Sequence, residues 1–148
     1  MTDALDENEL GAYFALVAAG DLIQRAVTTQ LGEHGLSPLQ FSVLARLLDA
    51  PAGLRMSELA DVLVVSRSGL TYQITQLEKS GLVERASSPG DDRGVVATLT
   101  ATGRDRVLGA FPGHVALVRE NFLDFLQPGE ADAIRVALER VVESLRGA

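Results

Sequence analysis

The sequence predicts a mainly α-helical chain that carries one small β-hairpin. Three observations support this. Apolar residues recur at helical spacing over most of the chain. Strand-like pattern is confined to two short segments that flank a link rich in turn residues. The 148 residues, of which 47% are hydrophobic, suffice for one compact core but not for two domains of ordinary size. We therefore expect a single domain over residues 1–148.

The first predicted helix spans residues 9–32. One face of it consists of Tyr13, Leu16, Ile23, Val27 and Leu31, and a neighbouring face of Leu10, Phe14 and Val17. This apolar arc is wide for a surface helix. It indicates burial against more than one partner.

The second predicted helix opens with a capping box. Ser37 is the cap, Pro38 takes the first helical position, and Gln40 follows the cap by three residues. The inner stripe of this helix consists of Phe41, Leu44, Leu47 and Leu48. Pro51 and Gly53 mark its end.

Two further helices are predicted with a tight turn between them. The first runs from Ser57 to about Leu63. Ser66 is a favourable N-cap for the second, which extends to Lys79 and is stopped by Gly81.

Residues 82–86 and 95–100 are predicted to be two short strands, because both are rich in leucine, valine or threonine. The link between them, residues 87–94, contains serine, proline, glycine and aspartate, so the pair is expected to form a hairpin.

A long helical pattern resumes after Thr100 and includes Val107, Phe111, Val115, Val118, Phe122 and Phe125. The Pro112-Gly113 pair predicts a kink or break within it. Pro128 is expected to open a last helix, with one face made of Ile134, Leu138, Val141 and Leu145.

Helix, tight turn, helix and polar-tipped hairpin together make the winged helix-turn-helix arrangement, which places its second helix in the major groove of DNA. In the helix that starts at Ser66, an inward stripe is formed by Leu70, Ile74 and Leu77, and Gln73 lies nearer that side. Hydroxyls, amides and cations cover the rest, as DNA contact requires. The candidate DNA-binding residues are Ser66, Arg67, Ser68, Thr71, Tyr72, Thr75, Gln76 and Lys79. An amphipathic helix with a solvated polar face is the alternative.

The hairpin tip adds two candidate DNA-binding residues. Arg93 stands where an arginine could enter a minor groove, and Asp92 beside it could hold the guanidinium in a fixed orientation. A solvated turn, in which these residues serve only turn geometry, is the alternative.

The run from Met56 to Arg104 resembles the core of the MarR family of transcriptional regulators. The most specific pieces are residues 77–85 (LEKSGLVER), then Asp92-Arg93, and then Leu99-Thr100 with Gly103. Their order and spacing together are a strong signal, and the flanking helical segments match the family in length and order.

The resemblance implies a DNA-binding lobe over residues 37–100 and a helical dimerisation lobe over residues 9–32 and 101–146. The helix that starts at Ser66 would be the recognition helix and Arg93 the wing-tip arginine. Many relatives carry arginine where this chain has Tyr72, Gln76 and Gly94. Fewer cations predict weaker nonspecific affinity and a smaller salt dependence.

The function implied is a sequence-specific regulator of transcription, a repressor in the first instance, that binds a pseudo-palindromic double-stranded operator. It would act as a homodimer, which would also bury the apolar terminal helices. The resemblance further implies a small aromatic or phenolic effector in the crevice between the lobes. The candidate pocket residues are Tyr13, Phe14, Phe41 and Phe111, with plain core packing as the alternative.

Charge and composition limit the other possibilities. The net charge of −7 argues against nonspecific nucleic-acid binding and leaves open a winged-helix protein-interaction module without direct DNA contact. Five basic and six acidic residues lie between Arg55 and Arg93, so this is the least acidic part of the chain. The absence of cysteine excludes disulfides, thiol-based redox sensing and cysteine zinc sites.

No enzyme, cofactor or metal site is predicted, because the sequence holds no nucleophile elbow, phosphate loop or ligand cluster. His34 and His114 each have a glutamate nearby, so a metal-sensing site and ordinary histidines both remain open. An acidic N-terminus and the lack of about 18 consecutive apolar residues predict a cytoplasmic protein.

Overall fold

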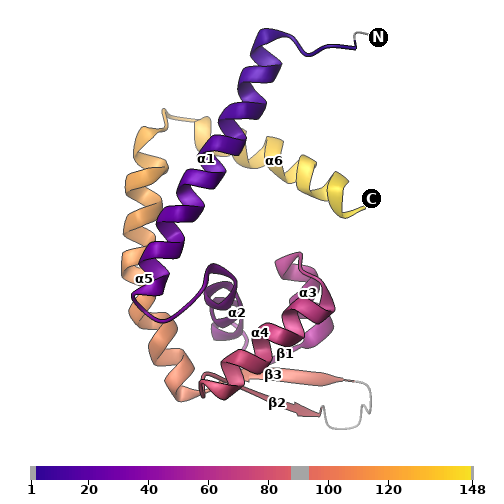
Figure 1. The fold of residues 1–148 in the computed structure, drawn as a ribbon, viewed down its shortest axis with the longest axis vertical. Coiled ribbons are helices and arrows are strands. Elements are labelled where there is room, and N and C mark those ends of the chain that lie inside the picture. The colour runs from indigo at the N-terminus through magenta and orange to yellow at the C-terminus, as the bar shows by residue number, and fades with distance from the viewer. Residues whose placement is uncertain (1–2, 88–93, 148) are drawn as a thin grey trace.

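The computed structural model describes residues 3–87 and 94–147 and confirms the mainly helical, winged helix-turn-helix fold (Figure 1). Within these residues there are six α-helices, a 3-10 helix and three short strands. In chain order they are α1 (Glu7–Gly32), α2 (Pro38–Leu48), β1 (Leu54–Arg55), α3 (Met56–Leu63), α4 (Arg67–Lys79), β2 (Val83–Ser87), β3 (Val95–Leu99), α5 (Ala101–Asn121), η1 (Leu123–Phe125) and α6 (Glu130–Arg146).

The strands form an antiparallel sheet in the order β1-β3-β2, with Ala97 opposite both Leu54 and Arg85. The predicted hairpin is therefore confirmed, and a third strand joins it. The sequence analysis missed β1 because two residues are too few to show strand periodicity. Gly53, at φ +90°, lets the chain enter β1 where a side chain would meet Val96.

The core lies beneath the helix-turn-helix unit. Leu70, Ile74 and Leu77 of α4 are buried as predicted, and so are Phe41, Leu44 and Leu47 of α2. The C-terminal turns of α1 add Val27 and Leu31, and α5 adds Val107 and Ala110. One continuous core thus ties the DNA-binding unit to the ends of α1 and α5.

The predicted caps are formed. Ser37 and Gln40 make a reciprocal capping box, and Ser66 Oγ accepts a hydrogen bond of 3.1 Å from the Gly69 amide. Gly81, at φ +75°, follows the end of α4. A second capping box, between Asp6 and Glu9, starts α1 two residues earlier than predicted.

Two expectations about the C-terminal half were wrong. Pro112 does not break α5, which continues to Asn121, while a kink there stays a prediction, and α6 begins at Glu130 rather than at Pro128. Pro112 is exposed, so the carbonyl that lacks a partner amide there can be hydrated. At α6, the Glu130 carboxylate accepts a hydrogen bond of 2.6 Å from the Gln127 amide, which fixes the turn before the helix.

The terminal helices leave large apolar surfaces uncovered. No residue of α6 is buried, and α1 buries only Val27 and Leu31. The N-terminal half of α1 extends away from the helix-turn-helix unit (Figure 1). Within residues 3–87 and 94–147, α1 is the one helix whose length and composition would allow it to cross a membrane, and 6% of its apolar window is buried.

Candidate nucleic-acid interface

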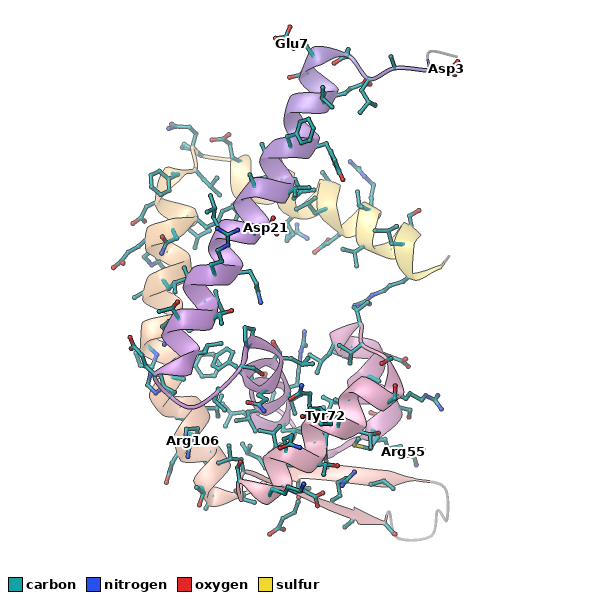
Figure 2. The ribbon with its side chains drawn as sticks, viewed as in Figure 1. Asp3, Glu7, Asp21, Arg55, Tyr72 and Arg106 are labelled. Carbon is teal, nitrogen blue, oxygen red and sulfur yellow. The ribbon has the colours of Figure 1, made fainter. Side chains whose placement is uncertain are left out.

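Six of the eight candidate residues at α4 form one exposed surface, which we call the α4 face: Ser66, Arg67, Ser68, Thr71, Tyr72 and Lys79. Tyr72 is 61% exposed, although its ring is large and partly apolar. Figure 2 places Tyr72 on α4, beside the hairpin and well away from α6. The α4 face offers hydroxyls and two cations, which are the groups that contact base edges and phosphates in a DNA groove.

The other two candidates, Thr75 and Gln76, are half-buried. Thr75 Oγ1 donates to the carbonyl of Thr71 at 2.9 Å and accepts from Arg85 Nη2 at 3.1 Å. Its hydroxyl is therefore already engaged on both sides, which makes Thr75 a poorer contact for a base than its position suggested. Gln73 is half-buried as predicted, and its Oε1 accepts from Gln40 Nε2 at 3.2 Å.

An ion pair that the sequence analysis did not assign joins the strand β2 to the helix α4. Arg85 Nε donates to Glu78 Oε1 at 2.7 Å, and the Arg85 amide donates to Glu78 Oε2 at 3.3 Å. Both side chains are about 70% buried, at 27% and 31% exposure. Both residues lie in the LEKSGLVER segment, but spacing within that segment could not reveal that they meet across a turn.

A groove of about 690 Å³ runs beside the α4 face. It is lined by Arg55, Met56, Ser57, Arg67, Leu70, Thr71, Arg85, Gly94 and Val95. Three of these are arginines and none is a carboxylate, but carboxylates beside the groove offset part of this charge, because Arg85 pairs with Glu78 and Arg55 Nε lies 3.9 Å from Glu58 Oε1. Figure 2 shows Arg55 at the strand end of this region, on the side opposite Arg106.

The two hairpin-tip candidates, Asp92 and Arg93, lie outside the described residues. The structure gives the direction of the two strands that lead to them, because β2 and β3 pair in register from Val83 opposite Leu99 to Ser87 opposite Val95. The described parts of β2 and β3 lie beside the C-terminal end of α4 and extend together away from α5 (Figure 1).

The four aromatic candidates fall into two pairs. Phe41 and Phe111 pack edge to face with ring centroids 5.2 Å apart, and His114 lies 4.6 Å from Phe41. Tyr13 and Phe14, with centroids 5.8 Å apart, are exposed. They precede the buried end of α1 by more than a dozen residues, or roughly 20 Å at the rise of an α-helix. A single chain does not bring the two pairs together.

The Phe41 pair has polar atoms beside it. His114 Nδ1 and Gln30 Oε1 are buried, and neither has a hydrogen-bond partner within the described chain. Burial lowers the pKa of His114 from its ordinary value, because the charged imidazolium loses hydration there. Gln30 Nε2 donates to the carbonyl of Ala110 at 3.3 Å, so this polar group joins α1 to α5.

A metal-sensing role for the two histidines finds no support in the geometry. No group of three or more potential ligand side chains is gathered anywhere in residues 3–87 and 94–147. The carbonyl of His34 accepts from Arg106 Nη1 at 3.1 Å, a contact that closes the end of α1.

Comparison with known proteins gives a consistent result. Residues 34–94 match the sequence model described as MarR family. The fold is similar to that of AbsC, a MarR family transcriptional regulator from Streptomyces coelicolor, at 32% identity and a TM-score of 0.94, covering 99% of this chain and 100% of AbsC.

Two further proteins extend the comparison. Sco3205 from Streptomyces coelicolor, a MarR family regulator solved in complex with DNA, is 30% identical with a TM-score of 0.93, covering 98% of this chain and 92% of that one. The transcriptional repressor Rv2887 of Mycobacterium tuberculosis is 33% identical over 99 residues, which are 67% of this chain and 69% of Rv2887.

Proposed function

The chain belongs to the MarR family of DNA-binding transcriptional regulators, and from that premise we propose that it is a repressor which binds a pseudo-palindromic operator as a homodimer. The observation that carries this proposal is the α4 face, which lies beside a groove containing three arginines. A regulator of this kind acts on chromosomal DNA, so its place is the cytoplasm. Repression follows if the operator overlaps a promoter, and the similar Rv2887 is named a repressor.

The α4 face fits direct base contact better than nonspecific attraction. Its short hydroxyls and the Tyr72 ring can reach base edges and thymine methyl groups. Arg67 and Lys79, at opposite ends of α4, are suited to the two flanking phosphate strands. With so few cations, affinity has to come from shape and from placed contacts.

The homodimer is supported by the surfaces of the terminal helices. Phe14 is 59% exposed and Leu145 is 70% exposed, in a chain whose α6 buries nothing. Exposed apolar surface of this extent marks an interaction site in a soluble protein. A second copy would cover it and would place two recognition helices about one DNA turn apart.

An operator titration tests DNA binding. Fluorescently labelled DNA from upstream of the protein's own gene is titrated at two salt concentrations, against a scrambled fragment of the same length. We expect specific binding that weakens as salt rises, and a marked loss in the Tyr72→Ala variant. Binding that is absent or insensitive to salt would favour the protein-interaction alternative.

Sedimentation at micromolar protein tests the dimer. We expect the mass of two chains for the natural protein and a shift toward one chain for Leu145→Asp. Lys79→Ala changes the net charge by the same single unit on the α4 face and should leave the mass unchanged. A monomer in the natural protein would contradict the proposal.

We also propose a small aromatic effector that acts at the contact between α2 and α5, where Phe41, Phe111 and His114 meet. A ring inserted there would change the angle between the two helices, and so the spacing of the recognition helices. Titration with 4-hydroxybenzoate should weaken operator binding in the natural protein and have less effect in Phe111→Leu. Equal effects in both would place the effector elsewhere.

A further inference from the structure

We propose that Arg85 is a positioning residue for DNA binding, which, with Glu78 and Thr75, fixes the β2–β3 hairpin against the recognition helix α4. We call these three residues the wing clamp. This inference rests on the proposed function, since it assumes that α4 and the hairpin contact the same operator. In this proposal Thr75 and Arg85 do not contact DNA themselves but hold in place the α4 and hairpin residues that do.

The geometry of the wing clamp spans a full turn of α4. Arg85 is the third residue of β2, while Glu78 and Thr75 are three residues apart near the C-terminal end of α4. The backbone amide and Nε of Arg85 use both oxygens of Glu78, and Nη2 reaches Thr75. Nε and Nη2 hold the guanidinium in one orientation while the amide holds the strand backbone, and no lysine ammonium can reproduce this pattern.

The wing clamp acts at the place where the two DNA-contacting elements diverge. After Lys79 the chain turns at Ser80 and Gly81 and enters β2 at Val83. The turn and the burial of Leu82 and Val83 hold the start of the strand against the core. The hydrogen bonds of Arg85 add a second attachment two residues into the strand, so that the hairpin and α4 move as one body.

Charge distinguishes this role from a direct phosphate contact. Arg85 lines the groove with Arg55 and Arg67, but its charge is offset by the carboxylate of Glu78. If charge alone mattered, removing Glu78 would strengthen DNA binding, because a negative group leaves the DNA-binding unit. The wing clamp predicts the opposite sign.

The first experiment compares Glu78→Ala with Glu58→Ala in an operator titration. Glu58 is the matched control, because its Oε1 lies 3.9 Å from Nε of Arg55, three residues earlier in the chain. This pair does not join the hairpin to α4. We expect Glu78→Ala to weaken binding about tenfold and Glu58→Ala to leave it equal or tighter. Tighter binding in both variants would overturn the proposal.

A second experiment combines Glu78→Ala with Arg93→Ala. If Glu78 acts by holding the wing, its loss should cost much less once the wing-tip arginine is gone, whereas independent sites give additive effects. Additive effects would overturn the proposal. If Arg93→Ala alone changes nothing, the wing-tip contact predicted from the sequence is wrong, and the comparison with Glu58→Ala still decides the wing clamp.

A third variant, Arg85→Lys, tests whether lost binding comes from the wing clamp rather than from a folding defect. It keeps the positive charge and should weaken operator binding about tenfold, with the slope of log affinity against log salt unchanged. Arg135→Lys is the control, because Arg135 pairs with Asp132 and Glu139 of its own helix. Unchanged affinity in Arg85→Lys would overturn the proposal, because lysine can keep a phosphate contact but cannot reproduce the hydrogen bonds of the wing clamp.

Discussion

Gly103, in the first turn of α5, lies so close to the carbonyl oxygen of Leu82 that a side chain at position 103 would overlap it. The same junction is held by Thr100, whose amide donates to the Leu82 carbonyl at 3.1 Å and whose Oγ1 donates to the Gly81 carbonyl at 2.7 Å. Thr100 also caps α5 by accepting from the Gly103 amide at 3.0 Å. The Leu99-Thr100 and Gly103 motif therefore joins the start of α5 to the end of the recognition helix.

Gly103→Ala should destabilise the fold by about 1–3 kcal/mol, because the added carbon meets backbone that cannot move aside. Urea unfolding at a fixed chain concentration measures the change. Gly109→Ala is the control in the same helix, where nothing lies within 4 Å. That variant should gain up to about 1 kcal/mol from helix propensity. Equal effects of the two variants would contradict the close approach.

The sequence predicted the elements that have strong local signals. Ser37 and Ser66 were identified as caps from residue type and position, and in the structure their side chains bond to amides three residues away. The buried stripe of α4 follows from helical spacing alone. The wing clamp and the Gly103 contact could not be predicted in this way. Both join residues across a turn, and nothing in the spacing of Glu78 and Arg85 fixes the distance between their side chains.

The four aromatic pocket candidates illustrate the same limit. Phe41 and Phe111 come from different helices and meet because α2 packs on α5, which periodicity cannot reveal. Tyr13 and Phe14 fit the apolar pattern of α1 equally well and yet remain exposed. An amphipathic pattern shows that a face will be covered, but not by which partner.

Val64→Gly should stabilise the protein by about 0.5–1 kcal/mol. Val64 forms the turn between α3 and α4 at φ +56°, a conformation that is costly for a β-branched residue. Its side chain is 59% exposed, so little apolar burial is lost on substitution. Thermal unfolding measures the gain. Val62→Gly, inside α3, should instead lose roughly 0.5 kcal/mol, because glycine is a poorer helix former than valine, and stabilisation by both would exclude relief of strain as the cause.

Lys79→Ala should weaken operator binding and reduce the salt slope by about 0.9, the value for one lost phosphate contact. Thr75→Val removes a hydroxyl from the wing clamp and no charge, so it should weaken binding with the slope unchanged. Titrations at three or more salt concentrations separate the two effects. An unchanged slope in Lys79→Ala would remove Lys79 from the phosphate contacts.

Acid should destabilise the natural protein through His114. Burial lowers the pKa of His114 in the folded state, so the unfolded chain binds the proton more tightly. The resulting penalty is absent well above the ordinary histidine pKa of about 6.5 and grows as pH falls through it. One proton can contribute at most about 1.4 kcal/mol per pH unit.

Urea unfolding at pH 7.5 and pH 5.5, at one chain concentration, measures this effect. The natural protein should lose more free energy of unfolding between the two pH values than His114→Leu does. His34→Gln is the matched control, because the His34 side chain has no hydrogen bond among the described residues while its carbonyl binds Arg106. This variant keeps His114 and shows the effect of losing an imidazole outside the α2–α5 contact. Equal losses in the natural protein and His114→Leu would show that the buried imidazole does not set the acid sensitivity of the α2–α5 contact.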